Sequence, residues 1–226
     1  NYQERRAELV RDGVTLRTQG DTEVLLETLR RDGLRGLDKL NGQFAFATYD
    51  ESSGELLLAR DRIGILPLYY AERDGFVVFA SEIKALLPAL EAPQLDDDAV
   101  EDYLTYRSVP PGNTLFKGIK KLTAGTAVRI GRDGKLRHET YWQIPYEMPA
   151  EMLDGDAAMK AVDEALEAAV SLRLVADVPV GAYLSGGLDS SLTVALMKKI
   201  REGADVQTFA AGFNDPRYDE LPYARQ

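Results

Sequence analysis

The stretch GAYLSGGLDSSLTVALMKK, residues 181–199, joins an apolar run to a helical pattern through a turn rich in glycine and serine. The run VPVGAYLS predicts a buried strand, and SLTVALMKKIREG predicts a helix because its apolar residues recur every three or four positions. A second strand, VQTFAAGF, follows. This order of strand, tight turn, helix and strand predicts a parallel sheet, so we expect this part of the chain to be α/β.

The turn SGGLDSS carries groups suited to binding phosphate. Gly186 and Gly187 permit positive φ and close approach of the backbone, and free N–H groups at a helix start favour an anion. Asp189 would repel phosphate unless it holds a divalent cation that bridges phosphate oxygens. Three hydroxyl groups add further donors: Ser185, Ser190 and Ser191. We therefore expect a phosphate chain with Mg²⁺; the alternative is a tight turn without a ligand.

The preceding residues predict a different architecture. YQERRAELVRDG and DTEVLLETLRRDG predict two helices that end at Gly13 and Gly33. Four short runs, QFAFATYD, ELLLARD, PLYYAE and FVVFAS, are separated by turns such as ESSG and ERDG, and they predict an antiparallel meander. After two further helices, GTAVRIGRDGKLRHETYW predicts a hairpin. The expected fold is therefore α+β followed by α/β.

A domain boundary is expected in residues 144–156, which are rich in proline, methionine and acidic residues and lack periodicity. The predicted domains are residues 1–145 and 150–226. From residue 157 onwards an apolar stripe predicts a helix; its members are Met159, Val162, Leu166, Ala169 and Val170.

Composition excludes several classes of function. The 226 residues carry 27 basic and 37 acidic side chains, and the net charge of −10 argues against a nucleic-acid partner. The absence of cysteine excludes disulfides and thiolate chemistry within these residues. The single histidine, His138, excludes a site of several histidines and is predicted to lie on a strand surface. No apolar run approaches the roughly 20 residues that span a bilayer, so no membrane partner is expected.

The acidic run Asp96–Asp98 allows two interpretations. It could ligate a metal, or it could lie at the N-terminus of a helix, where the helix dipole favours negative charge. Asp98 and Glu101 have the spacing of a capping box, which supports the second interpretation.

Two sets of motifs resemble known families. SGGLDSS resembles the pyrophosphate-binding loop (PP-loop) of the N-type ATP pyrophosphatases, which split ATP between its α and β phosphates. GDTEVLL, LNGQFAFATYD, LLLARDRIGILPLYY and FASEIKALL resemble successive blocks of class II glutamine amidotransferase domains. YLTYRSVPPGNTLFKGIKKLTAGTAVRI and RLVADVPVGAYLSGGLDSSL follow in the same order, so the whole chain resembles an internal fragment of the glutamine-hydrolysing asparagine synthetase family.

The resemblance implies a fold and an activity. Residues 1–145 would form part of an Ntn-hydrolase domain, an αββα sandwich that hydrolyses glutamine. Residues 150–226 would begin a PP-loop domain, which resembles adenine-nucleotide hydrolases and uses ATP and Mg²⁺ to adenylate aspartate before ammonia displaces AMP. The resemblance further implies a cytoplasmic enzyme that acts on ATP, glutamine and aspartate and often dimerises.

The resemblance also implies roles for particular residues. Asp21 would bind the amino group of glutamine; its alternative role is the N-cap of helix 22–32. Arg60 and Asp61 begin a block that would shape the domain and its tunnel, and they would form a buried or semi-buried ion pair. Asp189 would hold Mg²⁺. The residues expected to contact ATP or pyrophosphate are Leu184, Ser185, Gly186, Gly187, Leu188, Asp189, Ser190, Ser191, Ala211 and Gly212.

The chain departs from the family pattern in one decisive respect. The family's nucleophile is an N-terminal cysteine, and this sequence contains none, so no residue here is predicted to be catalytic and the fragment alone is expected to be inactive. Alternatives remain a β-lactam synthetase-like or cell-surface-polymer amidotransferase that adenylates another carboxylate, or a non-catalytic nucleotide-binding relic. Asp219 and Glu220 are either ligands or part of an exposed acidic turn.

Overall fold

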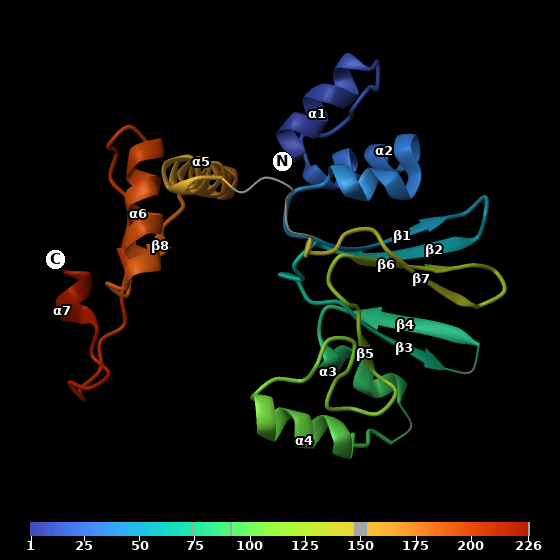
Figure 1. The fold of residues 1–226 in the computed structure, drawn as a ribbon. Coiled ribbons are helices and arrows are strands. Elements are labelled where there is room, and N and C mark those ends of the chain that lie inside the picture. Colours follow the sequence, from blue (N-terminus) through green and yellow to red (C-terminus); the bar gives the residue numbers. More distant parts are fainter. Residues whose placement is uncertain (74, 91, 147–152, 226) are drawn as a thin grey trace. The chain divides into compact units, whose positions relative to one another are not determined.

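The computed structural model describes residues 1–73, 75–90, 92–146 and 153–225. The chain divides into two compact units, Asn1–Tyr146 and Glu147–Gln226 (Figure 1). The turn predicted at ERDG and the boundary predicted at residues 144–156 lie partly outside the described residues.

The first unit combines helices with antiparallel strands. Its helices are α1 (Tyr2–Arg11), α2 (Asp21–Asp32), the 3-10 helix η1 (Gly33–Lys39), α3 (Ile83–Leu86), the 3-10 helix η2 (Leu87–Ala89) and α4 (Asp97–Tyr106). Its strands are β1 (Ala45–Asp50), β2 (Glu55–Arg60), β3 (Tyr69–Arg73), β4 (Phe76–Ala80), β5 (Lys120–Lys121), β6 (Thr126–Ile130) and β7 (Leu136–Thr140). The mixed α and β composition and the hairpin formed by β6 and β7 are confirmed.

The predicted single meander is wrong, because its four strands belong to two sheets. One sheet has the order β1-β2-β6-β7 and the other has the order β4-β3-β5. β2 pairs with the distant β6, with Leu58 opposite Val128, and not with β3, which follows it in the sequence. The segment between β2 and β3 therefore carries the chain from one sheet to the other.

Side chains alternate along the strands, and apolar side chains fill three layers: one between helices and the first sheet, one between the two sheets, and one between the second sheet and α3. Figure 1 shows the two sheets of the first unit between its helices. Leu57 and Ala59 of β2 face η1, where they pack with Leu37. The intervening Leu58 faces the second sheet, in a core shared by Leu58, Leu68, Tyr70, Leu122, Val128 and Ile130. On the far side of the second sheet, Ala71 packs with Leu86 of α3. The order of layers is thus helices, sheet, sheet and helices.

The second unit is a short strand-helix-strand arrangement preceded by a long helix. Its elements are α5 (Gly155–Arg173), β8 (Ala182–Tyr183), α6 (Leu188–Ile200), β9 (Thr208–Phe209) and α7 (Leu221–Ala224). β8 and β9 are parallel, which confirms the predicted pairing, although both strands are shorter than expected. The helix α6 begins at Leu188, so the second half of the predicted turn GGLDSS is the first turn of the helix.

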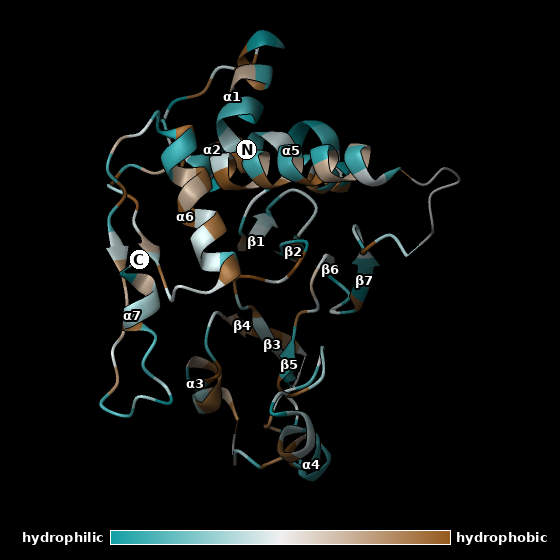
Figure 2. Cartoon of the chain, turned by 60° about the vertical axis from the view of Figure 1, so that its left-hand side comes forward, coloured by the Kyte–Doolittle hydropathy of each residue, from teal (hydrophilic) through white to brown (hydrophobic). Residues whose placement is uncertain are grey.

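The second unit buries little apolar surface among its described residues. Met197 of α6 is buried, whereas the rings of Tyr183 and Phe209 are 88% and 58% exposed and their centroids lie 6.4 Å apart. Polar and apolar residues lie on different sides of α5 (Figure 2), and Met159 and Val162 of the predicted stripe remain exposed. Tyr183 of β8 and Phe209 of β9 therefore form an aromatic pair that is mostly exposed.

The acidic run lies at a helix start, as the second interpretation required, but the predicted capping box is wrong. Asp96 is the N-cap of α4 and accepts the N–H of Ala99 at 3.4 Å, whereas Asp98 lies within the helix. Among the described residues, no three His, Cys, Asp or Glu side chains are grouped to hold a metal.

His138 lies exposed on β7, as predicted. None of the described helices has the length and apolarity needed to cross a membrane.

Candidate functional site

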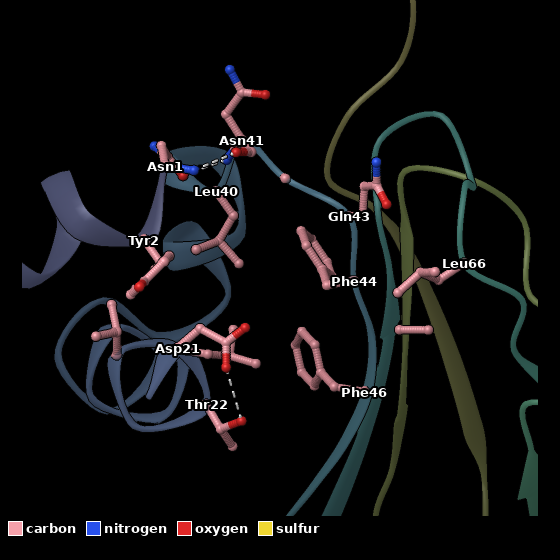
Figure 3. Close-up of a pocket in the computed structure, with 14 residues that line it drawn as sticks. Asn1, Tyr2, Asp21, Thr22, Leu40, Asn41, Gln43, Phe44, Phe46 and Leu66 are labelled. Atoms are coloured by element: carbon pink, nitrogen blue, oxygen red, sulfur yellow. Dashed lines mark hydrogen bonds between the residues drawn. The ribbon is translucent and has the colours of Figure 1, made fainter. Parts of the chain in front are cut away.

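A pocket of about 400 Å³ opens in the first unit between the start of α2 and the segment that leads into β1 (Figure 3). One side is polar and carries Asp21 and Thr22, and the opposite side is formed by the rings of Phe44 and Phe46 (Figure 3). The remaining lining residues are Asn1, Tyr2, Val24, Leu25, Leu40, Asn41, Gly42, Gln43, Ala45 and Leu66. A pocket with one carboxylate and an apolar wall suits a small ligand that has a cationic group and an aliphatic stem.

Asp21 lies in this pocket as the first residue of α2 (Figure 3). The N-cap is Gly20, so the alternative role of Asp21 as the N-cap is wrong. The carboxylate of Asp21 accepts the hydroxyl of Thr22 at 3.3 Å and remains exposed. Because a carboxylate has about four acceptor positions, Asp21 keeps capacity for a ligand.

The rim of the pocket is tied together by Asn1 and Asn41. The side-chain oxygen of Asn1 accepts the N–H of Asn41 at 2.8 Å, and its amide nitrogen donates to the carbonyl of Lys39 at 3.1 Å. These bonds hold the segment that follows η1 against the start of α1. Sequence reasoning did not identify Asn41 or its neighbour Gly42 as pocket residues, although an Asn-Gly pair before a strand is a recognisable turn signal.

Aromatic contacts fix the apolar wall. The Phe44 and Phe46 ring centroids are 5.6 Å apart, and the Phe44 ring stacks on Tyr141 at 6.5 Å. The Tyr141 hydroxyl donates to the carbonyl of Arg60 at 2.6 Å, and its burial raises the pKa of this phenol. The wall is therefore supported by a half-buried, hydrogen-bonded tyrosine, and sequence reasoning missed it because Tyr141 is distant in the chain.

Arg60 and Asp61 both lie in the described part of the chain and are buried. No direct ion pair joins these two described residues, so the predicted Arg60–Asp61 ion pair is wrong. The Arg60 guanidinium instead donates to the carbonyl oxygens of Leu66 at 2.6 Å, Gly64 at 2.5 Å and Leu122 at 2.7 Å. Burial lowers the pKa of Arg60, while the nearby Asp61 charge acts in the opposite direction. The guanidinium thus donates hydrogen bonds to three carbonyl groups. Two of them belong to the loop between β2 and β3, and the third belongs to the segment between β5 and β6.

The negatively charged Asp61 side chain binds the same loop as Arg60. Its carboxylate accepts the N–H groups of Ile65 at 2.9 Å and Leu66 at 3.1 Å. Its own backbone N–H donates to the carbonyl of Phe44 at 2.8 Å. Together with Arg60, it fixes both sides of the loop that places Leu66 in the pocket wall.

The predicted phosphate loop in the second unit is organised by its own serines. The Ser185 and Ser190 hydroxyls lie 3.0 Å apart. The Ser185 hydroxyl accepts the N–H of Gly187 at 3.3 Å, and the Ser190 hydroxyl donates to the carbonyl of Gly187 at 3.1 Å. The loop is therefore closed by side chains directly before α6, which leaves the helix N-terminus at its base.

α7 packs directly on two of the predicted glycines. Gly186 has a φ of +79°, and a Cβ there would lie 2.4 Å from Tyr223 Cβ. A Cβ on Gly212 would lie 2.3 Å from Leu221 Cδ1. Gly186 therefore requires glycine, because its φ is positive and backbone atoms of α7 lie against it, whereas Gly212 meets only the flexible side chain of Leu221 at this distance. Sequence reasoning missed the role of α7. Asp219 accepts the N–H groups of Leu221 and of Phe213, both at 3.3 Å, and so holds the preceding turn.

The structure brings the two predicted nucleotide-contacting segments to one sheet edge. Leu184, which follows β8, donates its N–H to the carbonyl of Phe209 at 2.9 Å, and Ala211 and Gly212 follow β9. Asp189 is exposed in the first turn of α6. Ligands of α/β sheets bind outside the carboxyl ends of parallel strands, which is where these residues lie.

Two families match the chain in succession. Residues 1–142 match the glutamine amidotransferase domain family, and residues 161–226 match the asparagine synthase family. The whole chain is 36% identical to asparagine synthetase (glutamine-hydrolyzing) 1 of Bacillus subtilis (strain 168) and covers 35% of that protein.

Further relatives give the same picture. The chain is 34% identical to a putative asparagine synthetase (glutamine-hydrolyzing) 2 of Methanocaldococcus jannaschii, in a match that covers 92% of this chain and 41% of that protein. It is also 34% identical to asparagine synthetase B (glutamine-hydrolyzing) of Escherichia coli (strain K12), in a match that covers 88% of this chain and 31% of that protein. A solved glutamine phosphoribosylpyrophosphate amidotransferase from B. subtilis is 20% identical, with a TM-score of 0.46 over 93% of this chain and 43% of that chain.

Proposed function

The chain belongs to the glutamine amidotransferase domain family, and on that premise we propose that it is part of a glutamine-hydrolysing asparagine synthetase. The observation that carries the proposal is the succession of an amidotransferase match and an asparagine synthase match along one chain. The full-length protein would release ammonia from glutamine, activate the side-chain carboxylate of aspartate with ATP and join the two, releasing AMP and pyrophosphate.

We assign residues 1–145 to the glutamine amidotransferase domain and residues 150–226 to the PP-loop domain. The layer order of the first unit, helices on either side of two packed sheets, supports an Ntn-hydrolase sandwich. The parallel strands with a glycine-rich turn between β8 and α6 support the start of a PP-loop domain.

Glutamine is the proposed ligand of the pocket in the first unit. The Asp21 carboxylate would accept hydrogen bonds from the ligand's ammonium group, and such charge-assisted bonds are stronger than neutral ones. The rings of Phe44 and Phe46 would contact the aliphatic part of glutamine on the opposite side. These 226 residues contain no cysteine, so their contribution would be to bind and orient glutamine, not to supply a thiolate nucleophile.

ATP is the proposed ligand of the loop in the second unit, and its adenylyl group would convert the poor carboxylate electrophile into a reactive acyl adenylate. Backbone N–H groups at the start of α6 and the Ser190 and Ser191 hydroxyls would hold pyrophosphate oxygens. Asp189 would hold Mg²⁺ together with phosphate oxygens, since Mg²⁺ at nucleotide sites uses one or two carboxylates and substrate phosphates. The exposed position of Asp189 at this helix start fits that donor set.

Pyrophosphate release by the full-length protein tests the proposed reaction. We expect release to require ATP, Mg²⁺ and aspartate, and asparagine to form with either glutamine or ammonia as the nitrogen source. Release that requires a different carboxylic acid would instead indicate a related synthetase. A folded protein that binds ATP but releases no pyrophosphate with any carboxylic acid would indicate a nucleotide-binding relic.

Replacing Asp21 with asparagine is expected to raise the KM for glutamine about 10- to 100-fold, because a hydrogen bond to a charged group contributes roughly 1.5–3 kcal/mol. The measurement is glutamine-dependent asparagine synthesis, expressed relative to ammonia-dependent synthesis in the same preparation. Asp97→Asn is the matched control, since Asp97 is likewise the first residue of a helix but is far from this pocket. Equal KM values for the two variants would contradict the assignment of Asp21.

A further inference from the structure

The loop that leads into the pocket is held by a carboxylate outside the pocket lining. Glu23, in the first turn of α2, accepts the backbone N–H of Arg17 at 2.7 Å. Its second oxygen accepts the backbone N–H and the hydroxyl of Thr18, at 2.6 and 2.7 Å. One side chain thus receives three hydrogen bonds from two consecutive residues of the loop that enters α2.

This arrangement differs from an ordinary capping box. A glutamate at the third helical position usually turns back to the N–H of the N-cap residue. Glu23 occupies that position but reaches past Gly20 to residues two and three places earlier. The Thr18 hydroxyl in turn accepts the N–H of Gly20 at 3.3 Å, which closes the loop onto the helix start.

Asp21 lies in the sequence between the loop of residues 17–20 and Glu23. Its backbone position is fixed on one side by the closed segment from Arg17 to Gly20 and on the other by the first turn of α2. Among the described contacts, its carboxylate has a single weak partner, the hydroxyl of Thr22. The direction of the Asp21 carboxylate therefore depends on the backbone that Glu23 organises.

We propose that Glu23 is a positioning residue for the ligand site at Asp21: it holds the loop of residues 17–20 so that the Asp21 carboxylate points into the pocket. The inference rests on the proposed function, because the ligand expected at Asp21 is glutamine. Glu23 does not line the pocket and acts only through the loop.

The charge state of Glu23 supports this role at neutral pH. Hydrogen bonds, first that of the Arg17 N–H and then those of Thr18, lower the pKa of the Glu23 carboxyl. A carboxyl group with a lowered pKa in the folded state contributes stability above its unfolded pKa and loses it as the pH falls through the folded value. The loop is therefore held at neutral pH and released only in acid.

Glu23→Gln tests the proposal in the full-length protein. The amide has nearly the same size but replaces one acceptor oxygen with a donor, so the N–H of either Arg17 or Thr18 loses its partner. We expect the KM for glutamine to rise about fivefold and kcat to change less than twofold. Glu27→Gln is the matched control: Glu27 lies one turn later on α2, binds Arg30 at 3.0 Å, and is expected to leave KM unchanged.

Amide hydrogen exchange and the melting temperature separate positioning from a general loss of structure. We expect faster exchange at Arg17 and Thr18 in Glu23→Gln at an unchanged melting temperature. An unchanged KM in Glu23→Gln, with a raised KM in Asp21→Asn, would overturn the role of Glu23 while leaving the proposed function intact. A lowered melting temperature with parallel loss of kcat would also overturn it. If Asp21→Asn binds glutamine normally as well, the assignment of Asp21 as a glutamine ligand also fails, while aspartate-dependent pyrophosphate release tests the proposed function separately.

Discussion

Replacing Asp61 with alanine is expected to lower the free energy of unfolding of the first unit by about 3–5 kcal/mol, the usual cost of removing one member of a buried charged arrangement. Asp61 is fully buried and Arg60 is 6% exposed. The substitution would leave the N–H groups of Ile65 and Leu66 without their acceptor and the Arg60 guanidinium without a compensating charge. Water has little access to replace these contacts.

Urea unfolding followed by the fluorescence of Trp142 measures this loss. Trp142 is the single tryptophan of the sequence and lies in the first unit, so its signal reports that unit. Asp133→Ala is the control: Asp133 pairs with Arg137 at 2.5 Å on the surface, and an exposed pair contributes less than about 1 kcal/mol. Equal shifts of the unfolding midpoint in the two variants would show that the Asp61 contacts are not an important source of stability.

Replacing Asp189 with alanine is expected to lower ATP-dependent pyrophosphate release by the full-length protein about 100-fold or more, the scale on which loss of one charge-stabilising group acts at an active site. Asp189 is the proposed protein ligand of Mg²⁺, and no group of three or more His, Cys, Asp or Glu side chains among the described residues is placed to hold a metal ion. Because Asp189 is exposed on α6, its removal should leave the fold intact.

Mg²⁺-dependent ATP binding, measured by calorimetry, separates binding from the later chemical step. Asp205→Ala is the control, since Asp205 is exposed beyond the C-terminal end of α6 and outside the loop. We expect Asp189→Ala to weaken binding of ATP with Mg²⁺ and Asp205→Ala to leave it unchanged. If Asp189→Ala binds ATP with Mg²⁺ normally, the role assigned to the SGGLDSS loop is wrong.

Local pattern was sufficient to predict most helices and the β6–β7 hairpin, because each depends on residues close in sequence. It was insufficient for the sheet order. The runs that form β1 to β4 alternate similarly, and nothing within them distinguishes one meander from two hairpins in separate sheets. The deciding contacts join distant segments: β2 pairs with β6, with Leu58 opposite Val128, and β3 pairs with β5.

The candidate sites show the same division. Asp21 was identified from its motif, but its neighbours Asn41 and Phe44 entered the pocket only through the packing of the segment before β1 against α2. Glu23 belongs to the same short motif, yet its three hydrogen bonds could not be predicted, because they depend on how the loop before α2 closes. In the second unit, the glycine-rich turn was evident from sequence, whereas the contact of Tyr223 with Gly186 was not.

The amino-acid sequence by itself determined which residues we propose for the chemistry, namely the acidic residue that begins α2 and the SGGLDSS turn, and it showed that these 226 residues contain no cysteine. These are properties of residue type and local spacing, and they do not depend on how distant segments meet. The tertiary structure alone decided which face of β2 meets the helices and which meets the second sheet, and where the pocket opens. Those outcomes depend on burial and hydrogen bonding between segments that are distant in the chain. No single stretch of sequence includes both partners of these contacts, so local pattern could not predict them.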